Sequence, residues 1–179
     1  MTGPRLRRVL LVGFMGAGKS SVGPELAGRL GWRFVDFDDV VEQRAGASIE
    51  TIFARDGEAR FRELEERVAR DLLAEDNVVL GSGGGWAAAP GRLDELPEGT
   101  ASVWLRVSAE RALERVRADA TARPLLAVDD PLAAASELLA GRVDAYRRAT
   151  WAVDTEGRTV EDVSARILAI LAETYPNRV

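Results

Sequence analysis

The sequence predicts an α/β fold with a parallel five-stranded sheet flanked by helices on both faces. Apolar runs followed by helical patterns recur along the chain, which is typical of βα units that build a parallel sheet. The first apolar run also leads directly into a glycine-rich loop, 13–21, and a helical pattern follows that loop. A strand, a loop and a helix in this order are expected to form the first unit of the sheet.

The first part of the chain supplies three candidate strands and four candidate helices. Continuous apolar runs mark the strands, and apolar residues spaced as on one helix face mark the helices. Gly31 and Gly46 end the first two helices, while Asp56 and Gly57 separate the next two. In chain order we expect a strand at 9–12, a helix at 19–30, a strand at 33–35, helices at 38–45, 49–55 and 58–74, and a strand at 78–80.

The second part continues the same alternation. Thr159 and Asp162 resemble a capping box, which predicts the start of the last helix. In chain order we expect a strand at 102–105, helices at 109–116 and 132–148, a short strand at 152–153 and a helix at 160–174.

The glycine-rich loop 13–21 matches the Walker A spacing G-x-x-x-x-G-K-[ST], which predicts a phosphate-binding loop. Its glycines permit backbone N–H groups to point at the phosphates of a nucleotide. Lys19, the only lysine in the chain, is expected to bridge the β and γ phosphates, and Ser20 to ligate Mg²⁺. A planar guanidinium would replace this compact ammonium poorly. The buried strand before the loop and the helix after it argue against a plain glycine-rich turn.

Composition narrows the function classes. The 179 residues, 46% of them hydrophobic, fit one domain, 1–179. A formal charge of −5 argues against general binding to nucleic acid or to an anionic membrane. The chain contains no Cys and no His, so carboxylates and other oxygen ligands remain for catalysis and metal binding. Because the N-terminal apolar run is too short for a signal or membrane segment, we expect a soluble cytoplasmic protein.

Two acidic residues follow the second candidate strand, at the edge where ligands gather in parallel sheets. Asp36 and Asp38 alternate along a segment that we expect to be extended, so one carboxylate can face a metal and the other an acceptor hydroxyl. Asp38 would orient or deprotonate that hydroxyl, while Asp36 supports hydrated Mg²⁺. The alternative is that Asp38 or Asp39 only caps the next helix.

A run of three glycines, 83–85, follows the third candidate strand. The absence of side chains allows a ligand to approach the backbone closely and to contact its N–H groups. A plain flexible turn explains the same residues, so this alternative stays open.

Two arginines and one loop are further candidates. Arg62 lies early in a charged helix and can reach a carboxylate, although Glu65 and Glu66 are available as ordinary helix partners. Arg142 follows the segment 118–130 and has no local signal that separates it from its neighbours. That segment escapes the helical pattern, and we expect it to form a mobile lid over a nucleotide, with an ordinary surface loop as the alternative.

The whole chain resembles the shikimate kinases, small P-loop kinases that phosphorylate the 3-hydroxyl of shikimate on the route to chorismate. The family motifs occur here in order. They are GFMGAGKS, Asp36-Phe37-Asp38, Glu42 to Gly46, Gly57-Glu58 through Arg62 to Glu65, Gly83-Gly84-Gly85, Arg123-Pro124-Leu125-Leu126, and Arg142 to Tyr146.

The resemblance implies a P-loop kinase fold, an ATP:shikimate 3-phosphotransferase that uses ATP and Mg²⁺, and a monomer. It implies that Lys19, Asp38 and Arg123 act in catalysis and that Ser20 and Asp36 serve the metal. It further implies that shikimate is bound by Asp38, Arg62, Gly83, Gly84, Gly85 and Arg142. The nucleotide would be bound by Gly16, Ala17, Gly18, Lys19, Ser20, Ser21 and Arg123, with Arg115 and Arg158 around the adenine.

Two departures from the family pattern bear on specificity. The proline of the motif R-x-P-x-Y is Asp144 here, and Trp86 after the three glycines is bulkier than expected. Trp86 narrows the pocket or, alternatively, packs in the core as we expect of the other tryptophans. An acceptor other than shikimate, another small-molecule kinase, and a nucleotide-binding switch without transfer chemistry are the competing functions.

Overall fold

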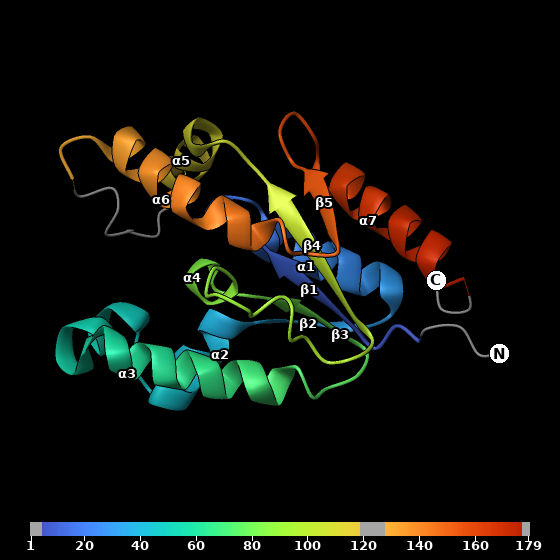
Figure 1. Cartoon of the computed structure of the whole chain (residues 1–179), viewed down its shortest axis with the longest axis horizontal. Helices are drawn as coiled ribbons and strands as arrows, with labels where there is room; N and C mark the ends of the chain where they lie inside the picture. Colours follow the sequence, from blue (N-terminus) through green and yellow to red (C-terminus); the bar gives the residue numbers. More distant parts are fainter. Residues whose placement is uncertain (1–4, 119–127, 177–179) are drawn as a thin grey trace.

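The computed structural model describes residues 5–118 and 128–176 (Figure 1). Within these residues five strands form one parallel sheet in the order β2-β3-β1-β4-β5. This confirms the predicted parallel five-stranded sheet. The strands are β1 (Arg8–Val12), β2 (Arg33–Asp36), β3 (Val78–Gly81), β4 (Thr100–Arg106) and β5 (Trp151–Asp154).

The central strand β1 divides the core into two layers. All five of its residues are buried, and Leu10 pairs with Leu80 of β3 and with Ser102 of β4. Because successive side chains alternate, Leu10 and Val12 join one apolar cluster whereas Val9 and Leu11 join the other. Both faces of the sheet are therefore covered, as expected for a parallel sheet.

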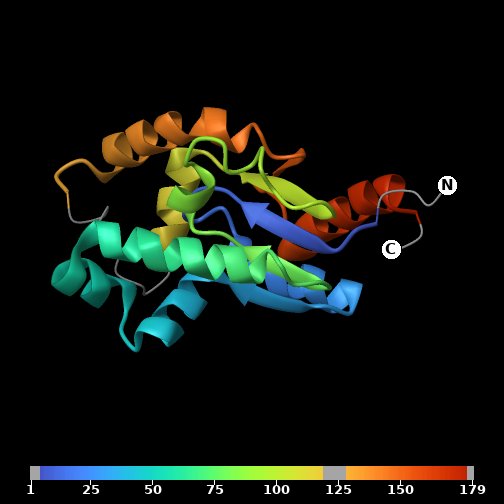
Figure 2. The same ribbon diagram turned by 60° about the horizontal axis from the view of Figure 1, so that its bottom comes forward.

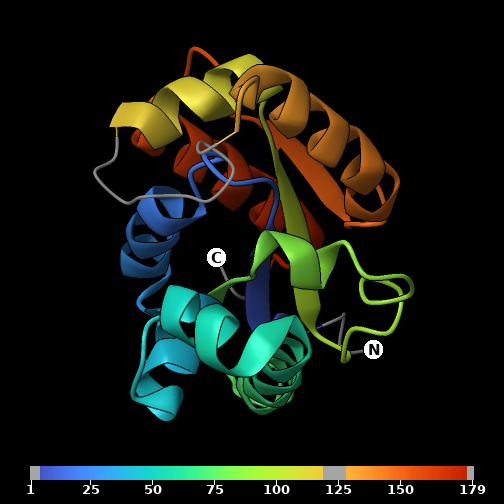
Figure 3. The ribbon, with the colours of Figure 1, turned by 90° about the vertical axis from the view of Figure 1, so that its left-hand side faces the viewer.

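Helices α1 (Lys19–Leu30) and α7 (Val160–Thr174) cover the face that Val9 and Leu11 share. On the other face lie α2 (Phe37–Ala45), α3 (Ile49–Leu72), α4 (Gly84–Ala87) and α6 (Pro131–Tyr146), with α5 (Ala109–Ala118) beside the loop after β1. The short helix α4 lies between α3 and α6 (Figures 1 and 3). Figure 2 shows α3 running along the sheet, starting from the edge of the sheet at which β2 leads into α2.

Most predicted elements are confirmed within one or two residues at their ends. Gly57 adopts a left-handed φ of 83° and interrupts α3, at the point where the sequence predicted a break between two helices. The predicted capping box also forms, since Asp162 N donates to Thr159 Oγ1 at 3.1 Å and Thr159 N donates to Asp162 Oδ2 at 3.3 Å.

One alternative was wrong and one expectation lies outside the described residues. The three glycines do not form a plain flexible turn, because Gly83 is the N-cap residue of α4 and Gly84 and Gly85 are its first residues. Most of the predicted lid, 118–130, lies in the part of the chain that the structure does not describe, and this part includes Arg123. In the described part, none of the helices combines the length and apolar character needed to cross a membrane.

Candidate functional site

A cavity of about 340 Å³ lies beyond the carboxyl ends of the strands. The loop after β1, the end of β2, the start of α2 and the loop after β3 form one part of its wall, and α5 and α6 form the other. This is the edge at which ligands bind in parallel sheets. The lining residues are Met15, Gly16, Gly18, Lys19, Ser20, Ser21, Asp36, Asp38, Ser82, Gly83, Gly84, Arg115, Val116 and Arg142.

The loop after β1 has a conformation that requires glycine. Gly16 has a left-handed φ of 70°, and a Cβ there would lie 2.5 Å from the carbonyl oxygen of Ala112 on α5. Gly18 has a φ of 99° and is the residue before α1, and the first three residues of that helix, 19–21, line the cavity. A helix N-terminus with free N–H groups is an anion-binding site. Ala17, in contrast, is fully buried in the core and does not line the cavity.

Lys19 is hydrogen-bonded to the loop that carries it. Its Nζ donates to Gly13 O at 2.7 Å and to Phe14 O at 3.0 Å. These contacts keep the ammonium at the cavity wall, where its charge partly opposes the rise that burial causes in the pKa of the Asp36 carboxyl. A phosphate group bound in the loop would meet this cation.

The two acidic residues have different environments. Asp36 Oδ1 accepts from Asp38 N at 2.9 Å, so Asp36 caps α2, and its Oδ2 accepts from Ser20 Oγ at 3.3 Å. Burial raises the pKa of Asp36, and the hydrogen bond from Asp38 N opposes that rise. The expectation of an extended segment was wrong for Asp38, which lies in the first turn of α2, and the capping role falls to Asp36 rather than to Asp38 or Asp39.

Each of the three glycines gives a different charged side chain room beside the backbone of α4. A Cβ at Gly83 would lie 2.3 Å from Glu65 Oε1 and 3.4 Å from Asp38 Oδ1. At Gly84 it would lie 3.0 Å from Arg142 Nη1, and at Gly85 it would lie 2.8 Å from both terminal nitrogens of Arg62. The glycines thus allow two arginines and two carboxylates to approach one short helix.

The two candidate arginines reach α4 from opposite sides. Arg62 comes from α3, where its Nη1 donates to Glu65 Oε2 at 2.7 Å and its Nη2 donates to Glu58 Oε1 at 3.3 Å. Both the helix pairing and the position beside Gly85 are therefore present, although Arg62 is not in the cavity lining. Arg142 comes from α6, lines the cavity, and holds its guanidinium carbon 5.9 Å from the centroid of the Phe14 ring.

Tyr146 supports α4 from the same helix as Arg142. Its hydroxyl donates to Gly84 O at 2.9 Å, and the residue is fully buried. Burial raises the pKa of the phenol, so it remains a donor at neutral pH. Asp144, the departure from the family motif, is 91% exposed and pairs with Arg147 at 2.9 Å, away from these contacts.

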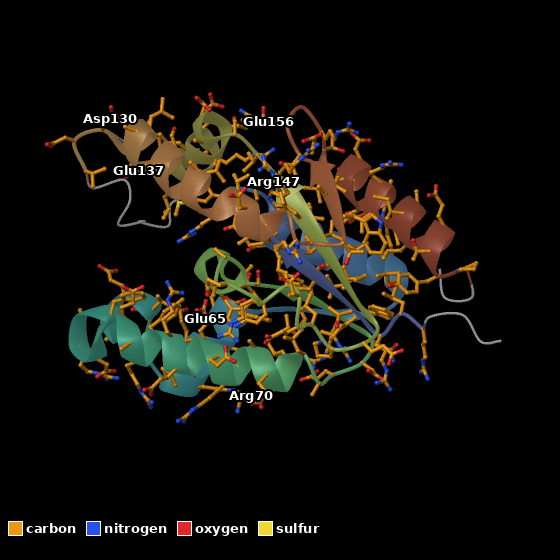
Figure 4. The ribbon with its side chains drawn as sticks, viewed as in Figure 1. Glu65, Arg70, Asp130, Glu137, Arg147 and Glu156 are labelled. Atoms are coloured by element: carbon orange, nitrogen blue, oxygen red, sulfur yellow. The ribbon has the colours of Figure 1, made fainter. Side chains whose placement is uncertain are left out.

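The sequence reasoning did not single out Glu65 as a site residue. It is only 1% exposed, and it projects from α3 on the side opposite to the exposed Arg70 (Figure 4). Burial raises the pKa of its carboxyl despite the hydrogen bond from Arg62. A usable signal was its spacing, because Glu65 shares a helix face with the buried Phe61, Val68 and Ala69.

The remaining candidates lie at the α5 wall of the cavity or outside the cavity. Arg115 on α5 lines the cavity and donates to Gly16 O at 2.9 Å. Arg158 is exposed on the loop between β5 and α7 and does not line the cavity. Trp86 is 5% exposed and packs edge-on against Phe37 with ring centroids 5.3 Å apart, which confirms the core-packing interpretation.

Comparisons with known proteins agree with this arrangement. The shikimate kinase family model matches residues 15–172. A shikimate kinase of Synechococcus sp. (strain RCC307) is 45% identical over 93% of this chain and 86% of its own length, and one of Geobacter sulfurreducens is 44% identical over 93% and 92%. A solved structure described as shikimate kinase from Acinetobacter baumannii in complex with shikimate superposes with a TM-score of 0.87, at 35% identity and 94% coverage of both chains.

Proposed function

The chain belongs to the shikimate kinase family, and we propose that it transfers the γ-phosphoryl group of ATP to the 3-hydroxyl of shikimate. The product is shikimate 3-phosphate, an intermediate on the route to chorismate and the aromatic amino acids. The observation that carries this proposal is one cavity whose wall contains a phosphate-binding loop, the Asp38 carboxylate and the Arg142 guanidinium. These groups suit a nucleotide and a small acid with several hydroxyls.

The nucleotide phosphates bind the loop after β1. Backbone N–H groups of the segment 16–21 surround the β-phosphate, and Lys19 bridges the β and γ phosphates. Arg123, which lies outside the described residues, supplies a second cation from the lid. Arg115 and Arg158 flank the adenine side, where α5 and the loop between β5 and α7 are joined by hydrogen bonds from Arg115 to Thr155.

Ser20 and Asp36 serve the Mg²⁺ that accompanies ATP. Their oxygens are already 3.3 Å apart in the cavity wall, so two oxygen ligands of the kind that Mg²⁺ prefers are adjacent. Among residues 5–118 and 128–176, no cluster of three or more acidic side chains could hold a metal alone. An Mg²⁺ ion held by Ser20 and Asp36 would neutralise phosphate charge.

Shikimate binds on the α4 side of the cavity. Arg62 and Arg142 approach α4 from α3 and α6 and together clamp the single carboxylate of shikimate by charge-assisted hydrogen bonds. Asp38 accepts hydrogen bonds from the hydroxyls, and the backbone of residues 83–85 lets the ring approach closely. The cavity between these groups and the phosphate loop brings acceptor and donor together.

Transfer then depends on position and charge more than on covalent chemistry. Asp38 orients the attacking hydroxyl and accepts its proton, while Lys19 and Arg123 stabilise the charge that spreads over the transferred phosphoryl group. The active unit in this proposal is a single domain that acts as a cytoplasmic monomer without nucleic acid.

Coupled ADP release with a panel of acceptors tests the function. We expect turnover with shikimate and far slower turnover with quinate, gluconate or nucleoside monophosphates. Equal rates with and without shikimate would instead favour a nucleotide-binding switch, and faster turnover with another acceptor would identify a different small-molecule kinase.

A further inference from the structure

Arg115 does more than line the nucleotide side of the cavity. Its Nη1 donates to Gly16 O at 2.9 Å and approaches Ala17 O at the longer distance of 3.5 Å. The same nitrogen donates to Thr155 Oγ1 at 3.0 Å, and Nη2 donates to Thr155 O at 2.9 Å. One guanidinium therefore connects the phosphate-binding loop with the residue that follows β5.

The hydroxyl of Thr155 is oriented so that it accepts a hydrogen bond from Arg115. The residue is 3% exposed, and its Oγ1 donates to Arg106 O at the end of β4 at 3.0 Å. Since the single hydroxyl proton is used by Arg106 O, the oxygen lone pairs remain for Arg115. The Thr155 N–H also donates to Arg106 O at 3.1 Å, which fixes the backbone independently of the hydroxyl.

The neighbouring residue holds the start of α5. Glu156 Oε1 accepts from Ser108 N at 2.5 Å, and Ser108 Oγ in turn accepts from Arg111 N in the first turn of α5. Figure 4 shows Glu156 on the loop between β5 and α7, next to α5. Residues 155 and 156 thus hold α5 at its N-terminus and, through Arg115, near its C-terminus.

The orientation of the loop peptides depends on this connection. All described peptide bonds are trans, so the carbonyl of one residue and the N–H of the next point in opposite directions. When Arg115 holds the Gly16 carbonyl oxygen, the N–H of the same peptide, which belongs to Ala17, is turned away from Arg115 and donates to Phe14 O at 3.1 Å. Because exposed carbonyl oxygens would repel phosphate, their capture by a cation favours the anion-binding state of the loop.

We propose that Thr155 is a positioning residue for the nucleotide, which acts by holding Arg115 on the Gly16 carbonyl and so keeping the phosphate-binding loop in its binding-competent conformation. The proposal rests on the nucleotide side of the proposed function. It assigns no contact between Thr155 and the nucleotide, and it predicts an effect on nucleotide affinity that passes through Arg115. A loop that is only partly in the competent conformation binds more weakly in proportion to that fraction.

The experiment is a double-mutant cycle on nucleotide binding. Thr155→Val removes the hydroxyl and keeps the shape, while Arg115→Lys keeps the charge but cannot reach both Gly16 O and Thr155. Calorimetric titration with MgADP, without acceptor, should give about tenfold weaker binding for Thr155→Val, near wild-type binding for Thr155→Ser, and little further loss when Thr155→Val is added to Arg115→Lys. The KM for shikimate should change less than twofold in Thr155→Val.

Ser102→Ala is the matched control, since it removes a buried hydroxyl of β4 that bonds Thr150 rather than the loop. It should lower the melting temperature and leave MgADP affinity unchanged. Unchanged affinity in Thr155→Val, additive losses in the double variant, or an equal loss in Ser102→Ala would each overturn the proposal. If Thr155→Val does not fold, Arg115→Lys and Thr155→Ser still decide it. A wild type that binds MgADP but does not phosphorylate shikimate would contradict the proposed function alone.

Discussion

The Oε2 atom of Glu65 lies 2.7 Å from Nη1 of Arg62, and the two partners differ sharply in burial. Glu65 is 1% exposed whereas the Arg62 side chain is 40% exposed. The buried carboxylate thus fixes one edge of a guanidinium that lies beside Gly85. An arginine held in this way is oriented before its ligand arrives, which reduces the entropy that binding costs.

We expect Arg62→Ala to weaken shikimate binding by roughly 2 to 4 kcal/mol, because the acceptor carboxylate loses a charge-assisted partner. The KM for ATP should change little, since Arg62 does not line the cavity beside the phosphate loop. Steady-state kinetics with each substrate varied in turn measure both values. An unchanged KM for shikimate would contradict the assignment of Arg62.

The Glu65 carboxyl should make stability depend on pH. Burial raises its pKa, so the folded state binds this proton more tightly than the unfolded state does. The stabilisation is complete below the unfolded pKa of about 4.3 and is lost as the pH rises through the raised folded pKa. We therefore expect the free energy of unfolding of the wild type, relative to Glu65→Gln, to decrease over that window and then stay constant.

Urea unfolding of both proteins from about pH 4 to about pH 8 measures this difference. The Asp36 carboxyl, whose pKa burial also raises, is present in both proteins and cancels in the comparison. The control is Glu63→Gln, which removes an exposed carboxylate from the same helix. The same pH trend in that variant would mean that burial of Glu65 is not the cause.

A Cβ at position 85 should weaken the binding of shikimate. It would lie 2.8 Å from both terminal nitrogens of Arg62, so Gly85→Ala must displace the guanidinium or shift α4. We expect the KM for shikimate to rise about tenfold with a smaller effect on ATP, because losing one oriented charged hydrogen bond costs about 1.4 kcal/mol or more.

Gly28→Ala is the control for this prediction. Gly28 lies inside α1, and a Cβ there would meet nothing within 4 Å. The substitution should leave both KM values unchanged and stabilise the protein by about 0.5 to 1 kcal/mol, since alanine is the better helix former. An equal rise of the shikimate KM in both variants would contradict the proposed clash between a Cβ at position 85 and Arg62.

The elements that the sequence predicted well are those with local causes. The run Val9 to Val12 is fully buried between two helical layers, and Lys19 begins a helix after a loop whose glycines need positive φ. Such features follow from hydrophobic pattern and backbone sterics within a few residues. The same holds for the break at Gly57 and the capping box at Thr159.

The site contacts that the sequence missed are between residues far apart in the chain. Arg115 bonds Gly16 across 99 positions, and the short helix α4 owes its setting to side chains from α3 and α6. Glu65 carries a charge on an otherwise apolar helix face, and only the fold shows that glycines leave room for it. Local propensity contains none of this information, because tertiary contacts decide it.

Glu42, the first residue of the motif from Glu42 to Gly46, connects α2 with the start of α3. Glu42 Oε1 accepts from Ile49 N at 2.8 Å, so a carboxylate of α2 captures the first N–H of α3. Because α2 carries Asp38 and α3 carries Arg62, this bond constrains the distance between two groups that we propose bind the acceptor. We expect Glu42→Ala to lower stability by about 1 kcal/mol and to raise the KM for shikimate but not for ATP.

Arg44 offers the matched comparison for Glu42. Its Nη1 pairs with Asp71 Oδ2 at 2.6 Å and also joins α2 to α3, but both partners are exposed. An exposed pair contributes at most about 1 kcal/mol, so Arg44→Ala should change the shikimate KM much less than Glu42→Ala does. Kinetics and urea unfolding of the two variants side by side measure the contrast. Equal effects on the shikimate KM would mean that Glu42 has no special role among the contacts between α2 and α3. A larger effect of Glu42→Ala would mean that the bond at the start of α3 sets the relative position of Asp38 and Arg62.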